Sequence, residues 1–491
     1  MTRLPLHPLL FAAYAVLFLY AQNLTEVLLV DIGAPLVRAV VGAAAALVLL
    51  ALLYRSPERG AIVASALVIA FFAFGHLAGV VGGDVSEATQ LAFWAVLIVV
   101  AALYAARADS VARTTRGLNL VAVVLIVLAA VTIVPYELQR AGRAPVSVAG
   151  PVAAASGATR APDIYYLVFD RYGSADAIQR RFGITGNDLY NWLESRGFQV
   201  PADSRGAYRA TDFSLAAILN MQYLDNLTEE IGRTSSDRTP AHEMLAHHAV
   251  GRFLKQQGYR YYHIGAWFEA TASIPIADEN LSFDTTIIPA LERVLGRQTP
   301  ETTFRDRHRG GTLFAFRQLH RLQSAPGPKF VFAHILLPHD PYVFHADGSV
   351  IPEAEAKASE EGPLYRGQIE FANANIESIV DELLAGPDSS DPIVIVQADE
   401  GPLFCRSVDC PEESVEYAAT RFGVLNALYL PGIDERLPAT FSTVNTFRTI
   451  FRDYFGADLP NLPVHSYSWP DNDHIYDFRD MNEFLEQRDT P

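Results

Sequence analysis

The feature that most constrains this chain is a series of apolar segments near its N-terminus. Five runs, almost free of charged residues, follow one another: Leu6–Ala21, Ala39–Tyr54, Ala61–Val81, Leu91–Ala106 and Leu118–Val134. Each is close to the roughly 20 residues with which a helix crosses a hydrocarbon core. Because backbone amides inside a bilayer must pair within their own segment, the runs should be helices. Buried helices of a soluble protein are the alternative, but five uncharged runs in succession favour a transmembrane domain over residues 1–136.

The short connections between these runs differ in charge, which predicts an orientation. Arg3, Arg55, Arg59, Arg107, Arg113 and Arg116 fall on one side, whereas Glu26, Asp31, Asp84 and Glu87 fall on the other, with Arg38 as the exception. Since basic loops stay in the cytoplasm, the N-terminus should be cytoplasmic. Five spans then place the C-terminal part outside, as an extracytoplasmic or periplasmic domain of an integral inner (plasma) membrane protein. An uncleaved anchor is favoured over a signal peptide because four more runs follow the first.

The part after Arg160 has a water-soluble, acidic composition, with 28 basic and 48 acidic residues. Such a domain would repel phosphate backbones, so nucleic acid is not expected as a partner. Residues 137–162, rich in Ala, Gly, Ser, Pro and Val, predict a linker. Cys405 and Cys410 predict a short disulfide if this part is exported, with two free thiols as the alternative.

From residue 163 to 491, β-type runs alternate with helical patterns. The predicted strands are Ile164–Phe169, Arg260–Ile264, Phe330–Ile335, Ile393–Gln397 and Leu425–Leu430. The predicted helices are Asp188–Arg196, Ser214–Tyr223, Ala241–Gln257, Tyr365–Leu384 and Val444–Tyr454. This alternation predicts a layered α/β domain with a mixed, largely parallel central sheet.

Polar residues follow three of these strands at the point where each strand ends. Asp170 comes after the first, His334 and His339 lie at the end of the third, and Asp399-Glu400 follow the fourth. Functional groups of such sheets gather beyond the carboxyl ends of the strands, so these residues predict one polar site. Asp170, Asp399 and Glu400 would repel one another unless a cation lay between them. One divalent metal ion is therefore expected, with Zn²⁺, Mn²⁺, Mg²⁺ and Ca²⁺ all open.

Thr211 stands where a polar segment passes into the apolar helix that contains Ser214. A hydroxyl at a helix N-terminus and in contact with a metal would be an activated nucleophile. The alternative is an ordinary N-cap, which the local sequence alone favours. Other residues are predicted to be structural: His242, His247 and His248 on a solvated helix face, and Trp267 and Phe268 in the core. His465 and His474 are left open between the site and the surface.

Four segments together resemble the sulfatase and alkaline phosphatase superfamily. They are PDIYYLVFDRYGSAD at 162–176, ATDFSLAAILN at 210–220, FAHILLPHDPY at 332–342 and IVIVQADEGP at 393–402. The layout is most similar to the membrane-anchored branch, the lipoteichoic acid synthase-like and phosphoethanolamine transferase-like proteins. The resemblance implies metal binding by Asp170, Thr211 and Asp399, and nucleophilic attack by Thr211 with Ser214 in support. It also implies phosphate contact or leaving-group protonation by His334 and His339. Glu400 stands where the family has histidine, and glutamate there favours a harder metal.

The expected function is metal-dependent transfer or hydrolysis of a phospho-group on an envelope lipid or lipid-linked glycan, through a Thr211 nucleophile. The alternative, motivated by Glu400, is a sulfatase-like domain that has lost catalysis and serves as a lipid-binding sensor or scaffold. Sulfate-ester hydrolysis is a weaker third hypothesis, because the formylglycine of such enzymes derives from Cys or Ser and Thr211 cannot supply it.

Overall fold

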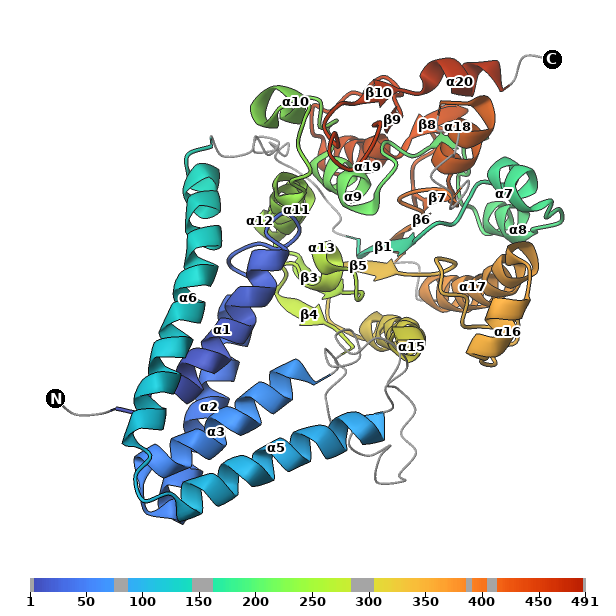
Figure 1. Cartoon of the computed structure of the whole chain (residues 1–491). Coiled ribbons are helices and arrows are strands. Elements are labelled where there is room, and N and C mark those ends of the chain that lie inside the picture. Colours follow the sequence, from blue (N-terminus) through green and yellow to red (C-terminus); the bar gives the residue numbers. More distant parts are fainter. Residues whose placement is uncertain are drawn as a thin grey trace. The chain divides into compact units, whose positions relative to one another are not determined.

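The computed structural model describes residues 4–74, 87–143, 162–283, 304–385, 391–403 and 413–488. Within these residues the chain forms two compact units (Figure 1). The helices before residue 144 make up the first unit, and the residues from 162 onward make up the second. The predicted cysteine pair, Cys405 and Cys410, lies outside the described residues.

The first unit contains helices at all five apolar runs. They are α1 (His7–Gln22), α2 (Gly33–Tyr54), α3 (Pro57–Ala73), α5 (Glu87–Arg107) and α6 (Ala112–Ala141). Among the described residues, three segments are long and apolar enough to cross a membrane: Gly33–Tyr54, Thr89–Arg107 and Ala112–Ala141. The expected count of five spans is not confirmed, because α1 is a shorter apolar helix and the run Ala61–Val81 ends outside the described residues.

Small residues set the packing within this unit. A Cβ placed on Gly60 would lie 2.4 Å from the backbone nitrogen of Ala51, so only glycine permits this approach of α3 to α2. Ala12, Ala43 and Ala122 are buried in the same bundle. Helix α6 continues to Ala141, so the first residues of the predicted linker 137–162 are helical.

The second unit is built on a six-stranded sheet of order β4-β3-β5-β1-β6-β7. Its strands are β1 (Ile164–Phe169), β3 (Arg260–Ile264), β4 (Glu279–Leu281), β5 (Lys329–Ile335), β6 (Ile393–Gln397) and β7 (Asn426–Tyr429). Every neighbouring pair is parallel except β6 and β7. The predicted mixed, largely parallel sheet is therefore confirmed. The three-residue strand β4 was not predicted, because it is too short to show a periodic pattern.

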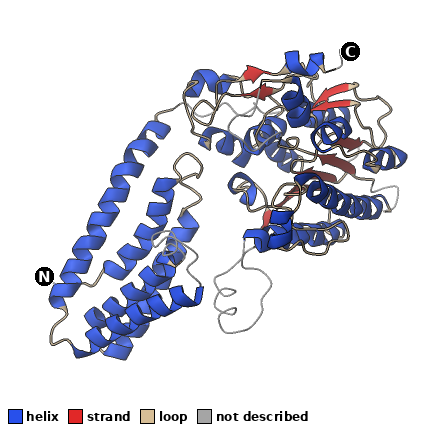
Figure 2. Ribbon diagram, turned by 45° about the vertical axis from the view of Figure 1, so that its right-hand side comes forward, coloured by secondary structure: helices blue, strands red, loops and turns tan. Residues whose placement is uncertain are grey.

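Helices cover both faces of this sheet, giving three layers (Figure 2). Ile164, Tyr166 and Val168 of β1 join one hydrophobic core and the alternating residues of the strand join the other. The first core includes α9 (Thr211–Asn220), α11 (Thr239–Ala246), α12 (Ala249–Gln256) and α19 (Thr446–Phe455). The second includes α7 (Ala175–Phe182), α8 (Leu189–Ser195), α15 (Phe304–Gln323) and α17 (Glu361–Leu384). Burial on both faces explains why β1, β5 and β6 are continuous apolar runs.

Shorter elements complete the unit around its rim. The helices are α10 (Asn226–Ile231), α13 (Glu269–Ala272), α16 (Glu353–Ala358), α18 (Val415–Phe422), the 3-10 turn Thr443–Asn445 and α20 (Asn482–Gln487). The strands form two small pairs, β2 (Asp203–Arg205) with β8 (Thr440–Ser442) and β9 (Tyr467–Ser468) with β10 (Arg479–Asp480).

The predicted helix Ala241–Gln257 is two helices, α11 and α12, that break at His247. His248 begins α12, where its Nδ1 accepts a hydrogen bond from the backbone N–H of Gly251 at 3.0 Å. The prediction of a solvated histidine face is wrong for His242 and His248, which are buried, whereas His247 is exposed. A histidine that caps a helix interrupts the apolar period without any signal in composition, so the sequence alone did not show the break.

Candidate functional site

The candidate site lies where the three central strands end. β1 pairs with β5 on one side and with β6 on the other, all in parallel, so their carboxyl ends are adjacent. Asp170 comes directly after β1, His334 is the penultimate residue of β5, and Asp399 follows β6. The three side chains are almost fully buried, with exposures of 2%, 1% and 0%. Sheet topology therefore brings together residues that are far apart in the sequence, as the sequence predicted for this end of the sheet.

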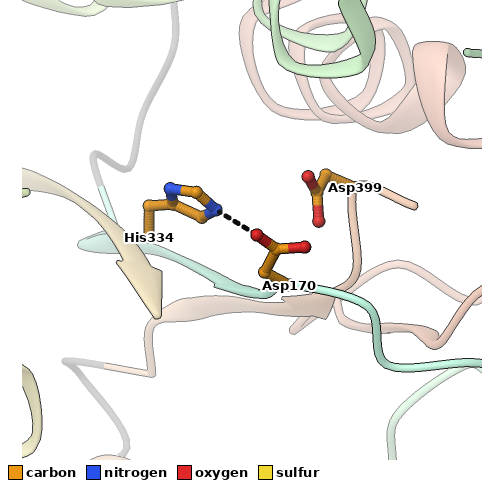
Figure 3. A group of neighbouring side chains, drawn as sticks. All are labelled: Asp170, His334 and Asp399. Carbon is orange, nitrogen blue, oxygen red and sulfur yellow. Dashed lines mark ion pairs between the residues drawn. The ribbon is translucent and has the colours of Figure 1, made fainter. Parts of the chain in front are cut away.

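Asp170, His334 and Asp399 each point an atom toward a common centre (Figure 3). One ligand-type atom from each lies within 4.8 Å of the others, and His334 Nε2 is 3.6 Å from Asp170 Oδ2. Among the residues that the structure describes, four buried atoms of this group find no hydrogen-bond partner: Asp170 Oδ1, His334 Nε2 and both carboxylate oxygens of Asp399. Buried polar atoms without partners are costly. Two carboxylates and one imidazole are ordinary ligands for a divalent cation, so these residues fit a bound metal ion.

The pKa values of the two carboxyl groups in this centre are shifted in opposite directions. Burial and the negative charges of Asp170 and Glu400 raise the pKa of Asp399 well above its usual range. Burial also opposes ionisation of Asp170, but His339, His334 and Arg171 together hold its pKa below the usual range. A charged Asp170 thus disfavours a charged Asp399, and a cation between them would remove that conflict.

Thr271 orients the imidazole of His334. Its hydroxyl donates to the carbonyl oxygen of Phe268 at 3.4 Å and lies 2.7 Å from His334 Nδ1. When Nδ1 of His334 carries the ring proton, it donates a hydrogen bond to this hydroxyl. This tautomer leaves the lone pair on Nε2, which faces Asp170, and such an arrangement is typical of metal-binding histidines.

Thr211 is the first residue of α9 and is 8% exposed. The N-cap position belongs to Ala210, and no side chain caps the helix, so the alternative of Thr211 as an ordinary N-cap does not describe this structure. The Thr211 hydroxyl is close enough to Asp399 to lower the pKa of that carboxyl, although neither Asp399 oxygen has a well-formed hydrogen bond. The Thr211 side chain and the Asp170–His334–Asp399 group therefore face the same region. Ser214, expected to support Thr211, donates to the carbonyl oxygen of Tyr208 at 2.8 Å.

A buried ion-pair cluster lies at the start of α9. Asp212 is fully buried and lies 2.8 Å from Arg238 Nη1 and 3.2 Å from His242 Nε2. Burial alone would raise the pKa of Asp212, but Arg238 and His242 hold it well below the usual range. The cluster therefore contains a carboxylate that stays charged at neutral pH beside the candidate nucleophile.

Replacing Asp212 by Asn is expected to destabilise the second unit by about 1–3 kcal/mol, because it removes the charge from the buried hydrogen bonds of Asp212 with Arg238 and His242. The folded-state pKa of Asp212 is depressed, so its contribution is complete above about pH 4 and shrinks as the pH falls below that value. Denaturant unfolding of the detergent-solubilised chain, followed by tryptophan fluorescence, measures the difference. Asp176→Asn is the matched control, because Asp176 pairs with Arg180 on the surface, and it should change stability by less than about 0.5 kcal/mol. A D212N variant as stable as D176N would contradict the interpretation.

Glu400 lies beside Asp399, but its carboxylate contacts arginines. Glu400 Oε1 is 3.1 Å from Arg171 Nε and Glu400 Oε2 is 2.5 Å from Arg421 Nη2. Among the described residues, the group with metal-ligand geometry contains Asp170, His334 and Asp399 without Glu400. The expectation that Glu400 binds the metal stays untested.

His339 lies near the three-residue group, since its charge acts on Asp170. It belongs to a cluster that the sequence did not reveal. The indole N–H of Trp267 donates to His308 Nδ1 at 3.0 Å, and the His308 and His339 rings are 6.4 Å apart. Trp267 was expected to be a core residue, and His308 on α15 carried no sequence signal. Burial and the charge of His339 lower the pKa of His308 to about 3, so His308 is neutral at physiological pH.

The two C-terminal histidines lie on the surface. His465 Nδ1 is 2.7 Å from Asp480 and His474 Nδ1 is 2.7 Å from Asp471, and neither belongs to the candidate metal group. Both histidines therefore pair with carboxylates at the surface and are not part of the candidate site.

Comparison with known proteins finds a sequence similarity within the second unit. Residues 202–417 match the Sulfatase family. No curated protein sequence matches the chain. Among solved structures, the C-terminal periplasmic domain of EcEptC from Escherichia coli is 12% identical, covering 66% of this chain and 94% of that one at a TM-score of 0.42. The zinc complex of the same domain is also 12% identical, and the match covers 69% of this chain and 98% of that one at a TM-score of 0.44.

A protein of the alkaline phosphatase superfamily from Vibrio parahaemolyticus is also 12% identical, covering 67% of this chain and 76% of that one at a TM-score of 0.41. These structural scores are too low to transfer a residue role or a substrate. The sequence match covers the segment from β2 through Asp399 to α18, which contains Thr211 and His334. On this match, residues 202–417 are similar to the Sulfatase family.

Proposed function

We propose that this protein is a metal-dependent hydrolase or transferase that acts on a phosphodiester of an envelope lipid or lipid-linked glycan. One observation supports this most directly: two carboxylates and an imidazole with unpaired buried atoms converge beside a threonine at a helix N-terminus. Such a site combines cation ligands with a hydroxyl that can act as a nucleophile.

Asp170, His334 and Asp399 would hold the cation, with Thr211 close to it. The mixture of imidazole and carboxylate favours Zn²⁺ or Mn²⁺ over Mg²⁺ and Ca²⁺. A bound cation would supply positive charge that stabilises the deprotonated Thr211 hydroxyl and the phosphate oxygens. His334, expected from the resemblance to contact phosphate, is assigned here to the cation because its Nε2 faces Asp170.

The chemistry of the chain then has two displacement steps. Thr211 Oγ1 gives its proton to a solvent water and forms a bond to phosphorus, while the bond from phosphorus to the leaving alcohol oxygen breaks. His339 donates the proton that the leaving alcohol needs. Water or a second alcohol then attacks phosphorus, the bond to Thr211 Oγ breaks, and the threonine recovers a proton. The outcome is hydrolysis when water attacks and transfer when an alcohol attacks.

The apolar N-terminal helices support a substrate class found at a membrane. Three segments long and apolar enough to span a bilayer would keep the second unit close to lipid head groups. The proposed location is the inner membrane with the second unit outside the cytoplasm, which rests on the asymmetric arginine distribution of the loops.

The direct test is turnover of a chromogenic nitrophenyl phosphodiester by the detergent-solubilised chain. Activity should require Zn²⁺ or Mn²⁺, disappear with a chelator and return when the metal is restored. A chain that binds metal but cleaves neither phosphodiesters nor lipid donors would contradict the proposal. A chain that binds no metal under these conditions would favour the sensor or scaffold function instead.

Thr271→Val is expected to weaken metal binding about 10- to 100-fold, because it removes the hydrogen bond that fixes the tautomer of His334. Calorimetric titration of the metal-free chain measures the affinity. Thr271→Ser is the matched variant: it keeps the hydroxyl, so it should bind metal nearly as well as the wild type. Equal affinity for the valine and serine variants would contradict the orienting role of Thr271.

A further inference from the structure

Glu400 is the centre of a network of buried charges next to the candidate site. Its side chain is 3% exposed, and its two carboxylate oxygens face two arginines, Arg171 at 3.1 Å and Arg421 at 2.5 Å. The side chain of Arg421 is itself only 6% exposed. Glu400 Oε1 accepts a hydrogen bond from Arg171, and Glu400 Oε2 forms an ion pair with Arg421 without hydrogen-bond geometry. Two guanidinium groups therefore balance the charge of Glu400, whereas no ion pair is found for Asp399 among the described residues, so Glu400 has less to gain from a cation.

Each arginine extends the network to a different part of the site. Arg171 Nη1 donates to Asp340 Oδ1 at 2.6 Å, and Asp340 directly follows His339. Arg421 donates from Nη1 to the carbonyl oxygen of Gly401 and from Nη2 to that of Arg209, both at 2.6 Å. Arg209 precedes Thr211 by two residues. Glu400 thereby connects the loop after β6 with the loops that carry His339 and Thr211.

The backbone at Arg171 adopts an unusual conformation that the surrounding residues stabilise. Arg171 has φ of 62°, a left-handed conformation that is unfavourable for non-glycine residues. The Tyr365 hydroxyl donates to the Arg171 carbonyl at 2.7 Å and stabilises this turn. The turn lets two successive residues reach different partners: Asp170 faces His334, while Arg171 faces Glu400 and Asp340.

We propose that Glu400 is a positioning residue that fixes Arg171 and Arg421, and through them the His339 and Thr211 loops, and that it is not a ligand of the metal. This inference rests on the proposed metal-dependent function. It accounts for glutamate at a position next to Asp399 without adding a third carboxylate to the cation.

The test compares Glu400→Gln with Asp399→Asn in the detergent-solubilised full chain, with metal content measured by mass spectrometry after loading with Zn²⁺ or Mn²⁺. Wild type and E400Q should each hold about one equivalent, whereas D399N should hold much less. E400Q should also lose about 10- to 100-fold in kcat on a phosphodiester with KM little changed, because misplaced catalytic groups slow the chemical step more than binding. Glu416→Gln, at an exposed partner of Arg180, is the matched control and should change neither quantity.

The outcomes separate the inference from the proposed function. Loss of metal from E400Q to the same extent as from D399N would make Glu400 a ligand and overturn the inference, while the proposed function stands. An E400Q variant with the metal content and the kcat of the wild type would also overturn the inference. A wild-type chain without metal would instead contradict the proposed function. If E400Q does not fold, Arg171→Lys tests the inference instead. Lysine keeps the positive charge but cannot bridge Glu400 and Asp340. The R171K variant should therefore bind metal like the wild type and have a lower kcat.

Discussion

Thr211→Ala is expected to abolish phosphodiester turnover, with kcat reduced at least about a thousandfold, because no other hydroxyl is proposed to form the covalent intermediate. Metal binding should survive at reduced affinity, since Asp170, His334 and Asp399 remain. Steady-state kinetics of the metal-loaded chain measure the loss. A second measurement, mass spectrometry of wild-type protein quenched during turnover, should show a phospho-group on Thr211 that T211A lacks.

Thr449→Ala provides the matched control for this substitution. Thr449 is also buried, but it lies on α19 and its hydroxyl contacts Asn461 at 3.4 Å. T449A therefore removes a buried hydroxyl without touching the site and should keep kcat within about twofold. Metal-dependent turnover that persists unchanged in T211A would show that Thr211 is not the nucleophile.

Asp399→Asn is expected to lower metal affinity at least about a hundredfold, because it removes the ligand whose two oxygens have no other partner. Without metal, D399N should be at least as stable as the wild type, since it removes a buried carboxyl repelled by Asp170 and Glu400. Thermal unfolding reports both effects. At a metal concentration of about 100 times Kd the wild type should gain about 2.7 kcal/mol, and D399N should gain almost nothing.

Asp381→Asn is the control for the stability measurement. Asp381 forms an exposed ion pair with Arg196, so its replacement should leave both the metal-free stability and the gain on metal addition unchanged. An equal gain for D399N and wild type would remove Asp399 from the metal site. A metal-free D399N that is much less stable than the wild type would contradict the electrostatic description of the buried pair.

The layout of the second unit could be predicted because its strands are buried on both faces. Ile164–Phe169 and Ile393–Gln397 are unbroken apolar runs, and they form β1 and β6 at the predicted residues. If these strands are parallel neighbours, their carboxyl ends are adjacent. The sequence therefore predicts that Asp170, His334 and Asp399 lie close together. The sequence was therefore sufficient where hydrophobic pattern and sheet topology determine position.

The remaining site residues depend on contacts that no local pattern encodes. Arg421 and His308 lie on helices whose sequences give no reason to single them out, and their partners are far away along the chain. The prediction of Glu400 as a metal ligand followed from its place beside Asp399 and is not tested, and the contacts of its side chain with Arg171 and Arg421 could not be predicted from the sequence. Which way a side chain turns at the end of a strand is decided by tertiary contacts, so sequence alone could not distinguish the two roles.

The count of membrane spans shows the same limit in the first unit. Apolar composition located the five helices of the described part of this unit, but composition does not fix where a helix ends. Helix α1 ends at Gln22 after 16 residues, whereas α6 continues to Ala141 over 30 residues. The lengths, and with them the number of spans, follow from packing between helices and from the surrounding bilayer.

Anomalous X-ray diffraction from crystals of the full chain loaded with Zn²⁺ or Mn²⁺ tests the central claim most directly. A single strong peak is expected within about 2.0–2.3 Å of a carboxylate oxygen of Asp170, one of Asp399 and Nε2 of His334, with Thr211 Oγ1 beside it. A map without density at that position, or with the ion held elsewhere and Thr211 turned away, would contradict it.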